Sequence, residues 1–113
     1  MTNETDLIIK KAGELGEKIS QSEIFLSYKK ASSELMANQD SFDKVKRFTR
    51  LSAVMREKQQ YAEEITQSEM DEVRSLAQNV FDDEIANNYI EVQNAFSSLM
   101  NDIFMEIEMK KTF

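Results

Sequence analysis

Turn-forming residues are almost missing from this chain of 113 amino acids, which contains two glycines and no proline. A sheet protein needs a tight turn every few residues, and glycine and proline supply the backbone conformations of many such turns. Long stretches are instead rich in Glu, Lys, Gln, Ala, Leu and Met, which favour helices. The sequence therefore predicts an all-α fold, and its length suits a single domain over residues 1–113.

Two six-residue segments, ISQSEI at 19–24 and ITQSEM at 65–70, are nearly identical. Each places Ser or Thr three residues before Glu, the spacing of a capping box at a helix N-terminus. Ser20 with Glu23 and Thr66 with Glu69 are therefore predicted to begin helices. The residues that follow the two segments do not align, which argues against a duplicated domain. A pair of phosphate-binding helix N-termini is disfavoured, because each segment places a glutamate where the anion would lie.

Other capping residues predict the remaining helix starts. Asn3 with Asp6 suits the first helix, Asp40 with Asp43 the third, and Asp82 or Asp83 the last. The first two helices are either separate or one kinked rod. We expect about five helices in a small antiparallel bundle, joined by short connections. They are predicted near residues 4–18, 21–38, 41–63, 67–81 and 84–110.

The predicted last helix is long for so small a protein. Its apolar residues from Ile85 to Ile103 recur at alternating steps of four and three, and the helix would be on the order of 35–40 Å long. The shorter helices cannot easily cover both of its ends, and large exposed apolar patches usually mark interfaces. We therefore expect a homodimer. The predicted dimer interface consists of Phe96, Leu99, Met100, Ile103, Phe104 and Ile107.

Charge is unevenly distributed along the chain, whose net charge is −7. Residues 40–62 hold six basic and three acidic residues, whereas residues 63–91 hold one basic and nine acidic. The segment DKVKRFTRL places basic residues on the third helix opposite its apolar stripe. This face is interpreted as an ordinary solvated surface, a contact to RNA, or a protein-binding surface. The predicted partner surface consists of Arg47, Arg50, Val54 and Tyr61.

Several chemistries are excluded by composition. Without cysteine the chain cannot form a disulfide or a thiolate site, and without histidine it lacks the usual general base near neutral pH. Asp82, Asp83 and Glu84 could coordinate Mg²⁺, but adjacent acids at a helix start more often serve as cap and dipole partners. We expect no enzyme activity and no cofactor. No apolar run reaches membrane-spanning length, so a cytoplasmic location without membrane contact is expected.

Three segments together resemble the YlbF/YmcA/YheA family of small bacterial helical proteins. They are LGEKISQSEIFLSYKKASSEL, FDKVKRFTRLSAVMREKQQ and IANNYIEVQNAFSSLMNDI. The matching features are a Leu-x-x-x-Ile run before a Ser-Glu helix start, Tyr28 with Ala31, a Phe-x-x-Leu then Gln-Gln stretch, and Tyr89 near the start of the last helix. The resemblance covers about residues 7–107. The short length and the lack of cysteine are most similar to the YheA branch.

The resemblance implies an all-helical protein that dimerises and has no catalytic residues. Better-studied relatives are regulatory adaptors in Gram-positive bacteria, affecting competence, sporulation and biofilm formation through a complex linked to the RNA-processing endonuclease RNase Y. Some relatives carry cysteines associated with iron–sulfur clusters, which this chain lacks. The expected function is a non-enzymatic adaptor whose partners are itself and another regulatory protein. The alternative is an RNA-binding protein that uses the basic face of the third helix.

Overall fold

The computed structural model describes residues 3–112, and five helices make up most of this range. They are α1 (Asn3–Ser20), α2 (Glu23–Met36), α3 (Gln39–Gln60), α4 (Gln67–Phe81) and α5 (Glu84–Thr112). Residues 3–112 contain no strand, so the predicted all-α fold is confirmed. The predicted bounds of α4 agree with the structure, and α5 extends two residues beyond its predicted end.

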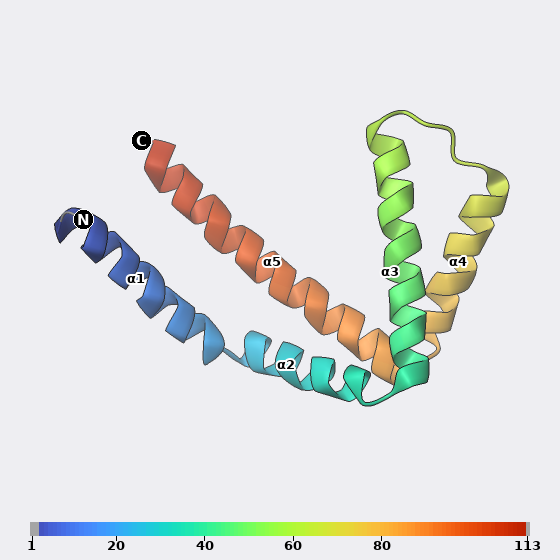
Figure 1. Ribbon diagram of the computed structural model, residues 1–113, viewed down its shortest axis with the longest axis horizontal. Coiled ribbons are helices and arrows are strands. Elements are labelled where there is room, and N and C mark those ends of the chain that lie inside the picture. Colours follow the sequence, from blue (N-terminus) through green and yellow to red (C-terminus); the bar gives the residue numbers. More distant parts are fainter. Residues whose placement is uncertain (1–2, 113) are drawn as a thin grey trace.

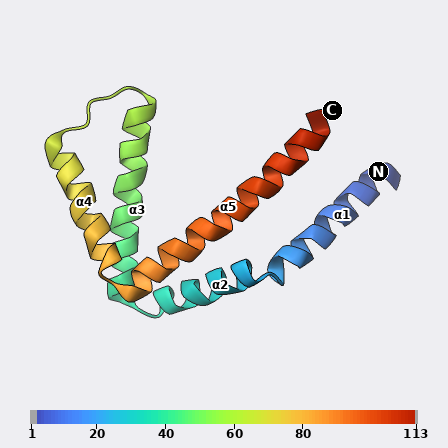
Figure 2. The same ribbon diagram turned by 180° about the vertical axis from the view of Figure 1, so that it is seen from behind.

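The helices form two arms that meet at one corner (Figures 1 and 2). Antiparallel α3 and α4 form one arm, α2 packs along α5 in the other, and α1 continues that second arm outward. The Cα radius of gyration is 18.6 Å, whereas a compact domain of this length has about 13 Å. The arrangement is therefore more open than the predicted small antiparallel bundle.

The core lies at the corner where the two arms meet. The ends of α2 and α4 and the starts of α3 and α5 converge there, so four helices contribute to it. Apolar residues that are half-buried, such as Phe42, Tyr89 and Ile90, pack against this cluster. The buried residues in the described part of the chain are Ala31, Leu35, Ser41, Val45, Val80 and Ala86. Most of the chain's apolar burial is thus concentrated at one end of each arm.

Asp83 connects the two arms at this corner. It caps α5 by accepting a hydrogen bond of 3.0 Å from the Ala86 N–H, which confirms one of the two predicted caps. The buried Ser41 hydroxyl donates to both of its carboxylate oxygens at 2.9 Å, and Lys44 Nζ lies 3.1 Å away. The Ala86 N–H, then Ser41 and Lys44, hold the pKa of Asp83 below its ordinary value, although partial burial opposes them. A single carboxylate therefore joins α3 to α5.

The predicted cap at Ser20 is wrong, because α1 continues two residues further than expected. The Ser20 hydroxyl donates to the Glu17 carbonyl at 2.8 Å inside α1. Ser22 caps α2 instead, accepting from the Phe25 N–H at 3.2 Å. This shift makes Glu23 the first residue of α2 rather than the third, so its carboxylate cannot complete a capping box. The first two helices are separate, with the break at residues 21–22.

The predicted cap at Asp40 is also wrong. Asn38 caps α3 by accepting from the Ser41 N–H at 3.1 Å. Asp40 lies within the first turn of α3, where it pairs with Lys44 at 3.1 Å. Asn3, the predicted cap of the first helix, is itself the first described residue of α1, and the residues before it lie outside the described range.

The end of α3 falls three residues before its predicted end. Tyr61 is the C-cap, and Ala62 adopts the left-handed conformation with φ of 55°. The Ala62 N–H donates to the Gln59 carbonyl at 3.3 Å, and the Glu63 N–H donates to the Lys58 carbonyl at 2.8 Å. These two bonds form a Schellman motif, which usually has glycine at the position of Ala62. The absence of that glycine from the sequence explains why the end of the helix was misplaced.

Candidate interaction surfaces

The first half of α5 is occupied by α2. Phe96 stacks on Tyr28 with ring centroids 5.1 Å apart and an interplanar angle of 10°, and it lies 5.5 Å from Phe25. Tyr28 also contacts Tyr89, and burial, followed by the hydrogen bond with Tyr28, raises the pKa of Tyr89. Phe96, placed in the predicted dimer interface, therefore already packs within its own chain.

The C-terminal half of α5 has a different environment. Leu99 and Ile103 are half-buried, whereas the other three predicted interface residues, Met100, Phe104 and Ile107, are exposed. Met105 and Met109 are exposed as well, and the five exposed side chains retain between 39 % and 59 % of their accessible surface. Met100, Phe104 and Ile107 share one side of α5 and are here called the α5 apolar surface, whereas Met105 and Met109 lie on the opposite side. A continuous apolar surface of this kind on a helix is typical of an interface.

Helix α1 is a second apolar surface, which the sequence analysis did not single out. It contains no buried residue, and no Cα atom of α1 lies within 8 Å of a Cα atom of α5. The start of α1 and the end of α5 nevertheless lie at the same end of the molecule (Figure 1). Leu7, Ile8 and Leu15 are exposed apolar residues that share one side of α1 and are here called the α1 apolar surface, whereas the exposed Ile9 lies on another side of the helix. The spacing of Ile8, Leu15 and the half-buried Ile19 on one side of α1 could have revealed this surface.

A groove between α3 and α4 contains three of the four residues of the predicted partner surface. Arg47, Arg50 and Val54 line a cavity of about 490 Å³ together with residues of both helices. The additional lining residues are Leu51, Glu72 and Leu76. Tyr61, the fourth predicted residue, is exposed at the C-cap of α3 and does not line the groove. We call the six lining residues the α3–α4 groove.

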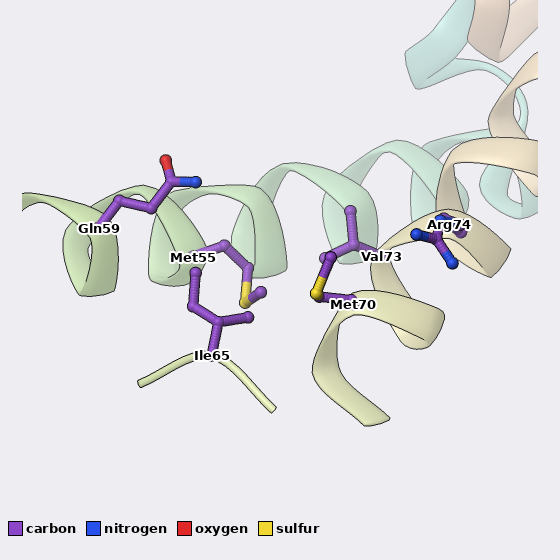
Figure 3. A pocket seen from close by; sticks show the side chains of 6 residues that line it. All are labelled: Met55, Gln59, Ile65, Met70, Val73 and Arg74. Carbon is purple, nitrogen blue, oxygen red and sulfur yellow. The ribbon is translucent and has the colours of Figure 1, made fainter. Parts of the chain in front are cut away.

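A second cavity, of about 300 Å³, lies between α3 and the start of α4 (Figure 3). Met55 and Gln59 of α3 line it together with Ile65, Met70, Val73 and Arg74, and the side chain of Met55 points toward Ile65. Ile65 and Met70 flank the capping box as a hydrophobic staple would, so their side chains lie beside the helix start. The apolar lining identifies this cavity as part of the packing between the two helices of this arm.

Glu69 ties the same two helices together. Its carboxylate completes the predicted capping box by accepting from the Thr66 N–H at 3.1 Å, while the Glu69 N–H donates to Thr66 Oγ1 at 3.1 Å. The ammonium of Lys58, on α3, also donates to this carboxylate. Lys58 first, and then the Thr66 N–H, lower the pKa of Glu69 to about 2. The repeated sequence motif thus forms a full capping box once, at its second occurrence.

The acidic residues at the start of α5 take part in the ends of two helices. Asp83 caps α5 and pairs with Lys44, Asp82 accepts from Gln78 at 2.9 Å, and Glu84 lies in the first turn. Among the described residues, no group of three or more acidic, histidine or cysteine side chains is placed to hold a metal ion. Within that same range, none of the helices has the length and apolarity to cross a membrane.

Comparisons with known proteins extend these observations. A family model described as control of competence regulator ComK, YlbF/YmcA, matches residues 8–110. UPF0342 proteins from three strains of Listeria monocytogenes are each 29 % identical to the chain over 92 residues, which cover 81 % of this chain and 79 % of theirs. No solved structure matches the chain. Because the family model covers nearly the whole sequence, the chain belongs to the YlbF/YmcA family, whose description is a regulatory one, the control of ComK.

Proposed function

We propose that this protein is a non-enzymatic regulatory adaptor of the cytoplasm that works as a homodimer. In this proposal the α5 apolar surface contributes to self-association, and the α3–α4 groove binds another regulatory protein. The description of its family, control of the competence regulator ComK, supports a regulatory role exerted on other proteins. The lack of histidine and cysteine supports a function through binding rather than catalysis.

The observation that carries the self-association is the exposure of the α5 apolar surface. Phe104 and Ile107 each leave more than half of their surface accessible in the single chain. Burying an apolar side chain of this size contributes roughly 1.5–3 kcal/mol. Because a twofold interface buries each residue twice, a second copy would cover this surface with a large gain in free energy.

The composition of the α3–α4 groove supports a protein partner over a nucleic acid. Leu51, Val54 and Leu76 give the groove an apolar lining, while Glu72 lies in it beside Arg47 and Arg50. An acidic side chain in a groove of a chain with net charge −7 would repel phosphates. A segment of a partner protein that presents both acidic and apolar side chains would fit the same lining.

Ile107→Asp tests the self-association. We expect the wild-type protein to have twice the chain mass in light scattering, and Ile107→Asp to weaken the dimer on the order of 100-fold, because two exposed apolar contacts are lost per dimer. Ser98→Asp, on the opposite and exposed side of α5, adds the same charge and is expected to leave the mass unchanged. A wild-type protein that stays monomeric at high micromolar concentration contradicts the proposal.

The partner surface is tested with the Val54→Asp variant. A regulatory protein captured by wild-type protein should be lost with Val54→Asp and retained with Ser98→Asp, since Val54 lines the groove and Ser98 lies on α5. Labelled RNA titrated at low salt distinguishes the alternative function, because phosphate contacts strengthen as salt falls. RNA binding that disappears in an Arg47→Glu, Arg50→Glu variant would replace the adaptor proposal with the RNA-binding one.

A further inference from the structure

Helix α1 lacks the support that a helix in a folded protein ordinarily has. It has 18 residues, no buried side chain and two glycines, and an added Cβ at Gly13 or Gly16 would meet nothing within 4 Å. Most of the stability of a helix in a protein comes from the packing of its apolar face, and each glycine within a helix weakens it further. The contacts that keep α1 helical therefore have to come largely from outside its own chain.

The α5 apolar surface is the natural counterpart of α1. The two helices lie in the same arm, with the start of α1 and the end of α5 at the same end of the molecule, yet their Cα atoms nowhere approach within 8 Å (Figures 1 and 2). From this geometry we propose that α1 is a dimerisation element that packs against α5 of a second copy, so that α1 and α5 of both copies form a four-helix bundle. This inference rests on the proposed self-association. It adds α1 to an interface that the proposed function places on the α5 apolar surface alone.

The charges of α1 and α5 favour a second copy of this chain as the partner that covers their apolar surfaces. Residues 3–20 contain three basic and four acidic side chains, and residues 100–111 contain two basic and three acidic. Packing α1 against α5 of the partner brings together two segments that each have a net charge of −1, so their mutual repulsion is weak. Residues 63–91, with one basic and nine acidic side chains, would instead repel a second copy of themselves.

The available area also suits a dimer. The α1 and α5 apolar surfaces together contain six large side chains, each between 39 % and 65 % exposed. A stable dimer buries about 800 Å² per partner. At roughly 100 Å² of accessible surface for each half-exposed side chain of this size, six of them provide about 600 Å² per partner, the lower end of the range for stable interfaces. The α5 apolar surface alone supplies about half of it, so α1 is needed to complete the interface.

The first test compares Leu15→Glu with Gly13→Glu. Both variants add one negative charge to α1, but Leu15 lies on its apolar side with Ile8 and Ile19, whereas Gly13 faces open space on the other side. We expect Leu15→Glu to raise the dimer dissociation constant at least about tenfold, and Gly13→Glu to stay close to wild type. Because α1 has no buried residue, Leu15→Glu should leave the thermal unfolding of α2–α5 unchanged at low concentration.

The second test uses hydrogen exchange in the Ile107→Asp variant. Ile107 lies on α5, whose Cα atoms stay more than 8 Å from those of α1 in the same chain, so an effect on α1 is expected to come through a partner. We expect the α1 amides to be protected in the wild-type dimer and to lose at least about tenfold in protection in the variant. A wild-type dimer whose α1 amides exchange as freely as those of the variant would overturn the inference.

The outcomes separate this inference from the proposed function. If wild-type protein is monomeric, the proposed self-association itself fails. If wild-type protein dimerises, Ile107→Asp dissociates it and Leu15→Glu does not, the α5 part of the proposal holds and the role of α1 is overturned. If both variants dissociate the dimer while Gly13→Glu and Ser98→Asp remain dimeric, α1 belongs to the interface.

Discussion

A single alanine ends α3 in a conformation that is costly for its side chain. Ala62 has φ of 55°, where the Cβ atom of an L-residue crowds the following carbonyl oxygen, at roughly 1–2 kcal/mol per residue. The two hydrogen bonds of the Schellman motif, from Ala62 to Gln59 and from Glu63 to Lys58, hold the residue there. Glycine at this position would make the same bonds without the steric cost.

We therefore predict that Ala62→Gly stabilises the protein. The relief of the left-handed strain outweighs the extra entropy of glycine in the unfolded chain, so the free energy of unfolding should rise by up to about 1 kcal/mol in urea titrations. Ala53→Gly, at an exposed position inside the same helix, should instead lower it by about 1 kcal/mol. Equal losses in the two variants would contradict this account of the α3 end.

At the scale of single residues, the sequence predicted a helix cap correctly where a capping side chain also stood at the right distance from the start of the helix. Thr66 with Glu69 and Asp83 were predicted as caps and act as caps. Ser20 was misassigned because Ser22 offers the same hydroxyl two residues later, and spacing alone cannot decide which serine ends the previous helix. Phe96 was assigned to the dimer interface because periodicity shows that a residue faces an apolar neighbour, but not which helix supplies it.

Between elements, the ion pair of Lys58 with Glu69 ties the last turn of α3 to the first turn of α4. The carboxylate serves both as the reciprocal half of the capping box and as the partner of Lys58. These interactions lower its pKa from 4.5 to about 2, so the folded protein binds a proton at this site less readily than the unfolded chain does. The interaction stabilises the fold fully above pH 4.5 and is lost as pH falls toward 2.

Glu69→Gln should therefore change the response of the protein to acid. We expect the variant to be less stable than wild type at neutral pH, and the difference to shrink as the pH is lowered from 4.5 toward 2, because only the wild-type carboxylate becomes protonated there. Urea unfolding measured at a series of pH values provides the comparison. Glu64→Gln, in the exposed link between α3 and α4, serves as the matched charge control. A difference that stays constant over this range would exclude the ion pair as its cause.

For the whole molecule, the joint at Asp83 matters more than any single helix. The two arms share the small core at the corner, and Asp83 connects them through Ser41 on one side and the α5 N-terminus on the other. Removal of the carboxylate would leave the buried Ser41 hydroxyl without its acceptor and α5 without its cap. Each of these losses costs roughly 1–2 kcal/mol.

We predict that Asp83→Ala lowers the free energy of unfolding by about 2–3 kcal/mol. Asp83→Asn keeps one oxygen acceptor for the Ala86 N–H and should cost less. Asp82→Ala, at the adjacent exposed position, should cost less than about 0.5 kcal/mol. Chemical denaturation of the three variants measures the order. If Asp82→Ala lowered the free energy of unfolding as much as Asp83→Ala, a negative charge at the start of α5, rather than the hydrogen bonds of Asp83, would determine stability.

The helical class and the positions of most helices could be read from the sequence, because composition, capping residues and apolar spacing are local signals. The two-armed arrangement could not, because it depends on which apolar faces meet. Ala31 and Leu35 lie on the predicted stripe of α2 and are buried, but the equally regular stripe of α1 remains exposed. The α3–α4 groove was found in part, since the basic face of α3 was visible in the sequence and Glu72 and Leu76 of α4 were not assigned to it.

The start of α1 and the end of α5 lie at the tip of the arm that they share, far from the corner that holds the core (Figure 1). A fluorophore or affinity tag attached at either terminus is consequently remote from the residues that hold the fold together. Resonance energy transfer between two differently labelled fusions would thus occur only when the tips of two molecules meet, so it would follow association and dissociation directly.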